Sequence, residues 1–349
     1  FWGELSYVCA PKGDQQGAAG EEAAGAQMEA VLGAEGVLQV IQEHVAQRPA
    51  APALVDAETG ACLSYQAADA GATAVAEALK AQGIGAGDVV ALLMRPSLPL
   101  AVGMVGVMKA GAAWVLVNPD DLDGEVTGLL ERSQARLVLS HAGGGIFAPE
   151  TTLPTWPLSA YGELMVDASS IPVPRRGAPR VSPDTAALIH TGAQFATLSH
   201  KALLHRVATV LHVAAAGPAS VVLAHTPVGA PEAVAEVLVG LVAGGATVVD
   251  ARPEDAARLA GVVRAQRVTV VCADAPMLRA LSEVAGPSPT LKHVVAVGGA
   301  VPLGVCTAVK QALGPQVRLH TVYAHAEAGA VAWTHAPGAG GAGGAAAAP

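Results

Sequence analysis

The sequence predicts an α/β protein built on parallel sheets, and two observations in residues 63–120 support that prediction. First, Val89–Leu93 and Ala113–Val117 are short apolar runs of strand length. Uninterrupted apolar strands are typical of parallel sheets, whose strands are buried on both faces. Second, helical patterns alternate with these runs, over Ala67–Gln82 and Leu98–Lys109. This alternation is the pattern of βα units.

The same alternation continues along the chain between two segments of low order. Residues 1–36 are expected to be a linker, and residues 337–349 are a Gly/Ala-rich tail with nothing to bury. The Pro-rich segment Ile171–Pro183 is the expected crossing between two subdomains. Further strands are expected at Leu137–Leu139, Ala186–Ile189, Ser220–Leu223, Thr247–Val249, Val268–Val271, His293–Val297 and Val317–Val322. Further helices are expected at Leu38–Gln47, Gly124–Ser133, His200–Ala215, Pro231–Val242, Glu254–Ala265, Pro276–Val284 and Leu303–Leu313.

Composition excludes several classes of protein. The net charge of −9 and the lack of a basic stripe argue against a nucleic-acid partner. No apolar run reaches the roughly 18 residues of a membrane span. The four scattered cysteines predict neither a disulfide framework nor a zinc motif, so a reducing, cytoplasmic setting is expected. Because the chain starts at Phe1, it is expected to be a piece of a longer protein.

Two segments carry a family resemblance. LSYQAAD (63–69) and MKAGAAWVLVNPD (108–120) resemble the first two signature motifs of AMP-forming adenylation domains, which include nonribosomal peptide synthetase modules. The resemblance runs in order through residues 37–336. It implies the large N-terminal part of an adenylate-forming enzyme, with two stacked parallel-sheet subdomains at about 37–180 and 181–336. The small C-terminal domain of the family has no counterpart in the 349 residues.

The resemblance also implies a chemistry. Such enzymes join a carboxylic acid to the α-phosphate of ATP, with Mg²⁺, and release pyrophosphate. The acyl group of the adenylate then passes to coenzyme A or to the phosphopantetheine arm of a carrier domain. The expected cofactors are therefore ATP/AMP and Mg²⁺, and the expected partners are a small-molecule carboxylic acid and a carrier domain. The acyl substrate and the thiol acceptor stay open.

The phosphate loop of the family departs most from its pattern in this sequence. In DTAALIHTGAQFATLSHKAL (184–203), Thr191 and Gly192 begin the loop, and Ser199 and His200 match the SH that follows it. The loop is about five residues shorter than the family pattern. It has no lysine between Thr191 and Ser199, and Ala193, Gln194 and Phe195 occupy its middle. Such a loop is not expected to wrap a triphosphate, unless a stretch is missing from the gene model.

The substrate motif is also altered. AHTPVGAPEAVAEV (224–237) resembles the peptide-synthetase form of this motif, with Pro231 in place of the aspartate that pairs with the substrate amino group. Glu232 is adjacent, but neighbouring helical residues point about 100° apart. An amphipathic helix that starts with proline explains these residues equally well.

Two later motifs supply the remaining candidate residues. HVVAVGGAVPLG (293–304) resembles the turn that packs along adenine, with Gly298, Gly299 and Ala300, where Ala300 replaces a glutamate. In LHTVYAHAEAGAV (319–331), Tyr323 matches the tyrosine near adenine. Glu327 matches the catalytic, magnesium-holding glutamate, and is alternatively a solvated acid.

Two functions follow from these motifs. The first is an ATP-dependent, AMP-forming acid–thiol ligase domain that is inactive with its short loop. The second is a non-catalytic, degenerate adenylation fold that binds a nucleotide or only packs against neighbours. The eleven histidines lack an HExxH spacing and are expected to be structural or at the surface. No GxSxG occurs, which argues against a serine hydrolase. No GxGxxG lies between a strand and a helix, which argues against a dinucleotide dehydrogenase.

Overall fold

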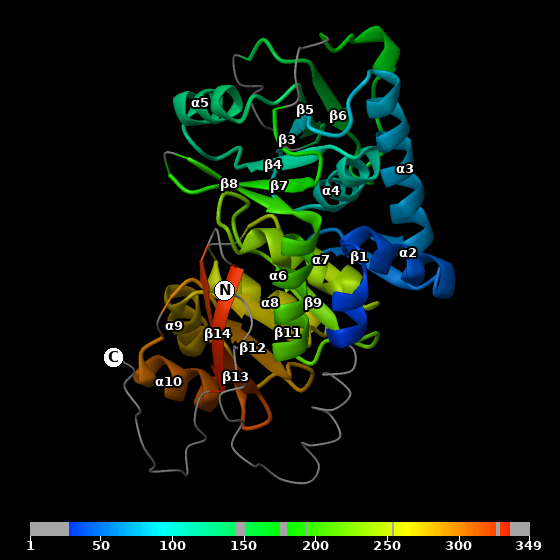
Figure 1. Ribbon diagram of the computed structural model, residues 1–349. Coiled ribbons are helices and arrows are strands. Elements are labelled where there is room, and N and C mark those ends of the chain that lie inside the picture. The colour runs from blue at the N-terminus through cyan, green and yellow to red at the C-terminus, as the bar shows by residue number, and fades with distance from the viewer. Residues whose placement is uncertain are drawn as a thin grey trace.

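The computed structural model describes residues 28–143, 151–174, 180–192, 194–252, 255–299, 301–325 and 329–335, with backbone alone for 323–325 and 329–335. Two sheets with helices on their faces are stacked one above the other (Figure 1). The predicted fold class, two stacked parallel-sheet subdomains, is thus confirmed. No helix among the described residues is long and apolar enough to cross a membrane.

The first sheet has six strands in the order β6-β5-β3-β4-β7-β8. All neighbours are parallel except β7 and β8 at the edge. Strands β3 and β4 are buried along their whole length, as their apolar sequences predict. The bounds are β3 Val89–Leu93, β4 Ala113–Val117, β5 Leu137–His141, β6 Thr155–Leu158, β7 Thr185–His190 and β8 Phe195–Ser199.

The second sheet has eight strands in the order β14-β13-β12-β11-β9-β10-β1-β2. Its centre is parallel, and each edge is closed by an antiparallel pair, β1–β2 and β13–β14. The bounds are β1 Pro52–Asp56, β2 Cys62–Ser64, β9 Val221–Ala224, β10 Ala246–Val249, β11 Val270–Ala273, β12 His293–Ala296, β13 Arg318–His325 and β14 Gly329–His335.

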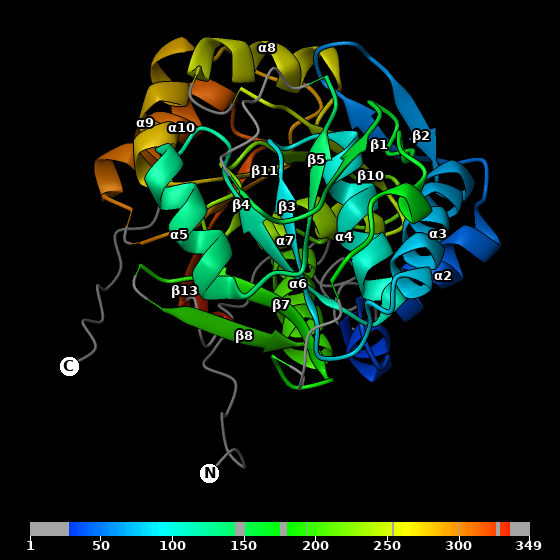
Figure 2. The ribbon, with the colours of Figure 1, turned by 90° about the horizontal axis from the view of Figure 1, so that it is seen from above.

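Helices separate and cover the two sheets. Helices α2, α3, α4, α6 and α7 share one apolar core with the inner faces of both sheets. Helix α5 covers the outer face of the six-stranded sheet, as Figure 2 shows from above, and α8–α10 cover the outer face of the other. The bounds are α2 Val37–Gln47, α3 Tyr65–Ala81, α4 Leu98–Ala110, α5 Asp123–Ser133, α6 His200–Val213, α7 Ala233–Val242, α8 Ala256–Ala265, α9 Ala275–Val284 and α10 Leu303–Leu313, with a short 3₁₀ turn at Ala168–Ser170.

The sheets exchange segments across the boundary expected near residue 180. The β1–β2 hairpin comes from the N-terminal part of the chain but pairs with β10 of the second sheet. Strands β7 and β8, which follow residue 180, complete the first sheet. Within the segment expected to be a linker, residues 28–33 are helical. The division of the chain into subdomains at about residue 180 remains a prediction. The two sheets do not divide there, because each contains strands from both sides of this residue.

Candidate functional site

Residues that follow three neighbouring strands of the second sheet lie close together at the carboxyl ends of these strands. Asp274 follows β11 and Gly298 follows β12. Glu232 lies in the connection from β9 to α7, directly before the first residue of that helix. A Cβ added to Gly298 would lie 3.7 Å from Oε1 of Glu232 and 3.8 Å from Cβ of Asp274. The carboxyl ends of parallel strands are where α/β proteins bind ligands. This turn is therefore the candidate site.

The backbone at the candidate site requires glycine. Gly298 has φ +81° and Gly299 has φ +152°, both in the region that residues with a Cβ rarely adopt. A Cβ on Gly299 would meet no atom of the described residues within 4 Å. Within the described part of the chain, the turn after β12 therefore leaves room beside its backbone for a flat ring.

The acidic residues of the site differ in how they are held. Asp274 caps α9 by accepting a hydrogen bond from the backbone N–H of Met277 at 2.9 Å. Glu232 lies at the start of α7, and its side chain makes no capping bond there. The Arg206 guanidinium donates a hydrogen bond to the carbonyl of Pro231, the residue before Glu232, at 3.3 Å. Burial lowers the pKa of Arg206, and the charge of Glu232 acts in the opposite direction.

A buried polar cluster supports the loop between β9 and α7. Glu236 is 1% exposed and accepts hydrogen bonds from the backbone N–H groups of His225 and Thr226, at 3.2 and 3.0 Å. The Nε2–H of His225 donates to the carbonyl of Cys272 on β11 at 2.7 Å. These bonds join the loop to helix α7 and strand β11, so they hold the backbone that leads to Glu232.

The predicted phosphate loop is a tight hairpin. The N–H of Thr191 donates to the carbonyl of Gln194 at 3.0 Å, and its hydroxyl contacts the same oxygen at 3.3 Å. His190 pairs with Phe195 in the antiparallel β7–β8 ladder. The expectation that the loop runs through Phe195 is wrong, because Phe195 already belongs to β8. Gly192 supplies the positive φ of +84° that the turn needs.

The sequence of the hairpin supplies no cation for a triphosphate. A phosphate cradle needs free backbone N–H groups and a cation. The N–H of Thr191 is already used within the turn. The nearest lysine along the chain, Lys201, has its ammonium on the carbonyls of Leu32 and Ala34, at 3.0 and 2.7 Å. We therefore derive no reaction step through the phosphates.

The structure brings together part of the predicted site. Gly298 and Gly299 lie at the end of β12, and the backbone of Tyr323 lies at the same end of the neighbouring strand β13. Thr191 and Gly192 belong to the other sheet. The side chain of Tyr323, and Ala193, Ala300, Ala326 and Glu327, lie outside the described part of the chain. The binding roles assigned to these residues remain predictions.

Sequence reasoning missed two contributors. Glu232 was expected to point away from the substrate position, yet its carboxylate lies against Gly298. Glu232 directly precedes the first residue of α7 and has helical backbone angles, φ −73° and ψ −32°. Asp274 was not singled out, although an acid between a buried strand and a helix-start proline is a capping signal.

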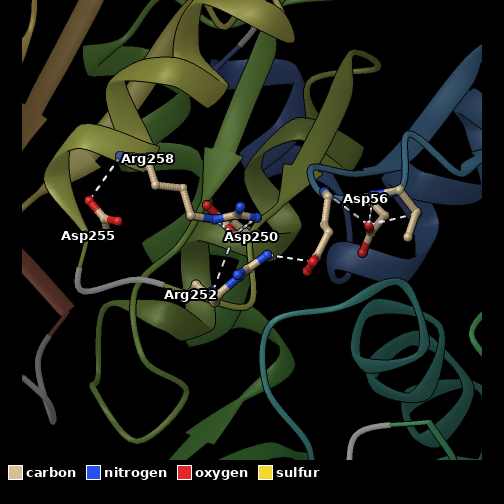
Figure 3. Close-up of polar contacts among 7 residues, drawn as sticks. Asp56, Asp250, Arg252, Asp255 and Arg258 are labelled. Atoms are coloured by element: carbon tan, nitrogen blue, oxygen red, sulfur yellow. Dashed lines mark hydrogen bonds and ion pairs between the residues drawn. The ribbon is translucent and has the colours of Figure 1, made fainter.

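A second polar cluster lies at the carboxyl ends of β1 and β10 (Figure 3). Asp250 is 1% exposed, and its Oδ1 accepts from Nη2 and Nε of Arg258, at 3.0 and 3.2 Å. Arg252 pairs with Glu58 in the turn that follows Asp56. Asp255 caps α8 beside them. Each of the two arginines pairs with one carboxylate, so the cluster joins α8 and the β1–β2 hairpin to the end of β10.

Comparison with known proteins identifies the family. The family model described as AMP-binding enzyme matches residues 41–346, so the chain belongs to the AMP-binding enzyme family. It is an adenylation domain of the kind found in nonribosomal peptide synthetases.

Individual relatives support the same family assignment. The chain is 30% identical over 293 residues to phosphinothricin tripeptide synthetase PhsB of Streptomyces viridochromogenes, covering 80% of this chain and 24% of the relative. It is 27% identical over 303 residues to surfactin synthase subunit 2 of Bacillus subtilis (strain 168), covering 83% of this chain and 8% of the relative. The AMPPNP-bound nonribosomal peptide synthetase FmoA3 (S1046A) shares the fold with a TM-score of 0.72 and 23% identity, over 84% of this chain and 32% of that one. The chain thus spans a minor part of these proteins.

Proposed function

We propose that this adenylation domain descends from enzymes that activate a carboxylic acid with ATP, and that it retains an adenine-nucleotide site without completing adenylation. The family match supports the nucleotide, since the family is that of AMP-binding enzymes. The similarity to an AMPPNP-bound synthetase supports it at the level of fold. The second part of the proposal rests on the β7–β8 hairpin.

The hairpin is the observation that carries the proposal. Its four-residue turn closes on itself through Thr191 and Gln194, and residues 190–200 contain no lysine or arginine. Phosphoryl and adenylyl transfer depend on positioned N–H donors and cations around the phosphates. A turn without a cation supports nucleotide retention through the base and sugar rather than through the β- and γ-phosphates.

The proposed adenine position is the glycine turn after β12. The positive φ angles of Gly298 and Gly299 and the nearby backbone of Tyr323 support it. Glu232 and Asp274 would lie on the side of the turn where a substrate acid is expected to enter. Two carboxylates there disfavour an uncompensated acidic group and favour a substrate that also carries a cationic group, such as an amino acid.

Calorimetric titration with AMP and with ATP plus Mg²⁺ tests the proposal. We expect saturable binding with similar dissociation constants for the two nucleotides, because the hairpin gives the extra phosphates no partners. ATP binding more than tenfold tighter than AMP would contradict the loss of phosphate recognition. Failure of both to bind at millimolar concentration would contradict the proposal and favour a fold that binds no nucleotide and only packs against neighbours.

A further inference from the structure

Positive charge gathers on one part of this acidic chain. Residues 256–325 contain seven lysines and arginines but only two aspartates and glutamates, whereas the whole chain has a net charge of −9. These residues form β11–β13 and helices α8–α10. Of the two acids, Asp274 caps the start of α9 and Glu283 lies near its end. This part of the molecule therefore carries a net positive charge on a protein that is otherwise strongly acidic.

Four exposed cations meet at the amino ends of neighbouring strands. Arg267 precedes β11, Lys292 precedes β12, and Arg318 is the first residue of β13. The N–H of Arg318 donates to the carbonyl of Lys292 at 2.8 Å, and the N–H of Lys292 donates to the carbonyl of Thr269 at 2.9 Å. Arg264 lies in the last turn of α8, directly before the turn that holds Arg267. Neighbouring strands lie about 4.8 Å apart, so these backbones fall within roughly 15 Å of one another.

None of these four side chains forms an ion pair with another described residue. A cation in the last turn of a helix is stabilised by the helix dipole, which accounts for Arg264. Arg267, Lys292 and Arg318 lie outside helices, so the dipole does not account for them. Like charges held close together repel, and a negatively charged partner relieves the repulsion. The four residues thus form a basic edge that favours an acidic partner.

A shallow apolar depression lies beside the basic edge. The ends of the three outer helices line it, with Val263, Arg264, Leu281, Ala285 and Leu313. The space it encloses is about 10 Å³, room for one water molecule, so an aliphatic side chain would lie across the depression rather than enter it. Val284, directly before Ala285, is 49% exposed. A partner that fits this surface therefore carries an exposed apolar residue among acidic ones.

The chain itself presents such a segment between β4 and α5. Leu122 is 74% exposed, more than any other large hydrophobic side chain in the described part of the chain. Residues 118–131 around it contain five acids and no lysine or arginine. Asp120 is neutralised in an ion pair, whereas Asp121 and Glu125 form none with the described residues. Residues 120–125, called the acidic loop below, thus combine negative charge with an exposed leucine.

We propose that the basic edge and the adjoining depression bind the acidic loop of a second copy of this chain, with Leu122 lying across the depression. The two surfaces lie at different ends of the molecule, because α5 is at the top of Figure 1 and α10 at the bottom. One copy therefore cannot join its own two surfaces. A contact in which each copy uses a different surface is heterologous, and it adds copies head to tail.

Sedimentation velocity of the purified chain over a range of protein concentrations tests the proposal. We expect the weight-average sedimentation coefficient to rise with concentration at about 0.02 M salt, and to rise much less at about 0.3 M, where charges are screened more strongly. The measurement needs neither nucleotide nor substrate, so its outcome is independent of the proposed function. A sedimentation coefficient that stays constant with concentration at low salt would overturn the proposal.

Two variants, each with a matched control, locate the contact. Leu122→Ser removes the apolar residue of the acidic loop, and Lys292→Glu reverses one charge of the basic edge. Each should weaken association by about tenfold or more. Met165→Ser and Lys80→Glu make the same kinds of change at exposed positions elsewhere and should leave association unchanged. Circular dichroism confirms that each variant is folded. Equal association in the two variants and their controls would contradict the assigned contact.

A mixture of the two variants gives the sharpest result. Each variant keeps the surface that the other has lost, so Leu122→Ser and Lys292→Glu should associate with each other although neither associates with itself. The complex should stop at two chains, because no second intact contact is left to extend it. A mixture that stays monomeric while the unchanged chain associates would show that these two surfaces do not bind one another.

Discussion

The hydroxyl of Thr226 donates a 2.5 Å hydrogen bond to Oε1 of Glu236, inside the core between β9 and α7. Together with two backbone N–H groups on Oε2, it surrounds a carboxylate that is 1% exposed. Burial raises the pKa of Glu236 above its usual value, although these bonds and the charge of His225 act in the opposite direction. The loop that carries Glu232 into the candidate site thus depends on a buried acid.

Glu236→Gln should change how stability depends on pH. A carboxyl whose pKa is raised by folding stabilises the protein below its unfolded pKa, and this contribution is lost as the pH rises through the folded pKa. The wild type should therefore lose stability relative to Glu236→Gln between about pH 4.5 and the raised pKa. Urea unfolding from pH 4.5 to 8.5 measures this, with exposed Glu77→Gln as control. A constant difference between wild type and variant across this range would contradict the prediction.

Arg136→Ala should be strongly destabilising. Nη1 of Arg136 lies 2.8 Å from Oδ2 of Asp88 and donates to the carbonyl of Gly83 at 2.8 Å, and the Arg136 side chain is 6% exposed. Removing one partner of a buried ion pair costs about 3–5 kcal/mol. Arg95→Ala removes the exposed pair with Asp120 and should cost less than about 1 kcal/mol. Equal losses in urea unfolding would show that burial does not set the strength of these pairs.

Tyr65→Phe should weaken the junction between α3 and the second sheet. The buried hydroxyl of Tyr65 donates to the carbonyl of Gly245 at 2.8 Å and lies 3.1 Å from the carbonyl oxygen of Leu241, near the end of α7. Without the hydroxyl the buried carbonyl of Gly245 loses this donor, at a cost of about 1–3 kcal/mol. Tyr161→Phe changes a half-exposed ring and should be neutral. Thermal unfolding of the two variants compares them, and a neutral Tyr65→Phe would contradict the assigned role.

Gly298→Ala should destabilise the turn after β12 and weaken AMP binding. The φ of +81° costs a residue with a Cβ about 1 kcal/mol or more, although the added atom would make only ordinary contacts. Gly304→Ala is the control, because it lies in α10 with no atom within 4 Å of the added Cβ and alanine favours helix. Calorimetry and urea unfolding of both variants should find losses in Gly298→Ala alone.

The sequence predicted the elements whose own residues determine them. Strands β3 and β4 have the predicted bounds, because a fully apolar run has few alternatives to a buried parallel strand. The hairpin β1–β2 and strand β14 were not predicted. Short edge strands have weak local patterns, and their partners lie far away in sequence: Leu54 pairs with Thr247. Local periodicity contains no information about such pairing.

Only part of the candidate site could be predicted from the sequence, because some of its contacts also depend on distant pairing of strands. The glycines at 298 and 299 were found because their role is conformational and is visible in the local sequence. The contacts of Glu232 and Asp274 with that turn depend on strand order β9-β11-β12, which only the folded sheet defines.

The most direct measurement of the central claim is ATP–pyrophosphate exchange by the purified chain with pools of amino acids and other carboxylic acids. We predict no exchange above the protein-free background, because the N–H of Thr191 is used within the turn and residues 190–200 supply no lysine or arginine for the phosphates. A well-folded sample that still binds AMP makes that negative result interpretable. Robust, acid-dependent exchange would contradict the account and show that this hairpin still supports adenylation.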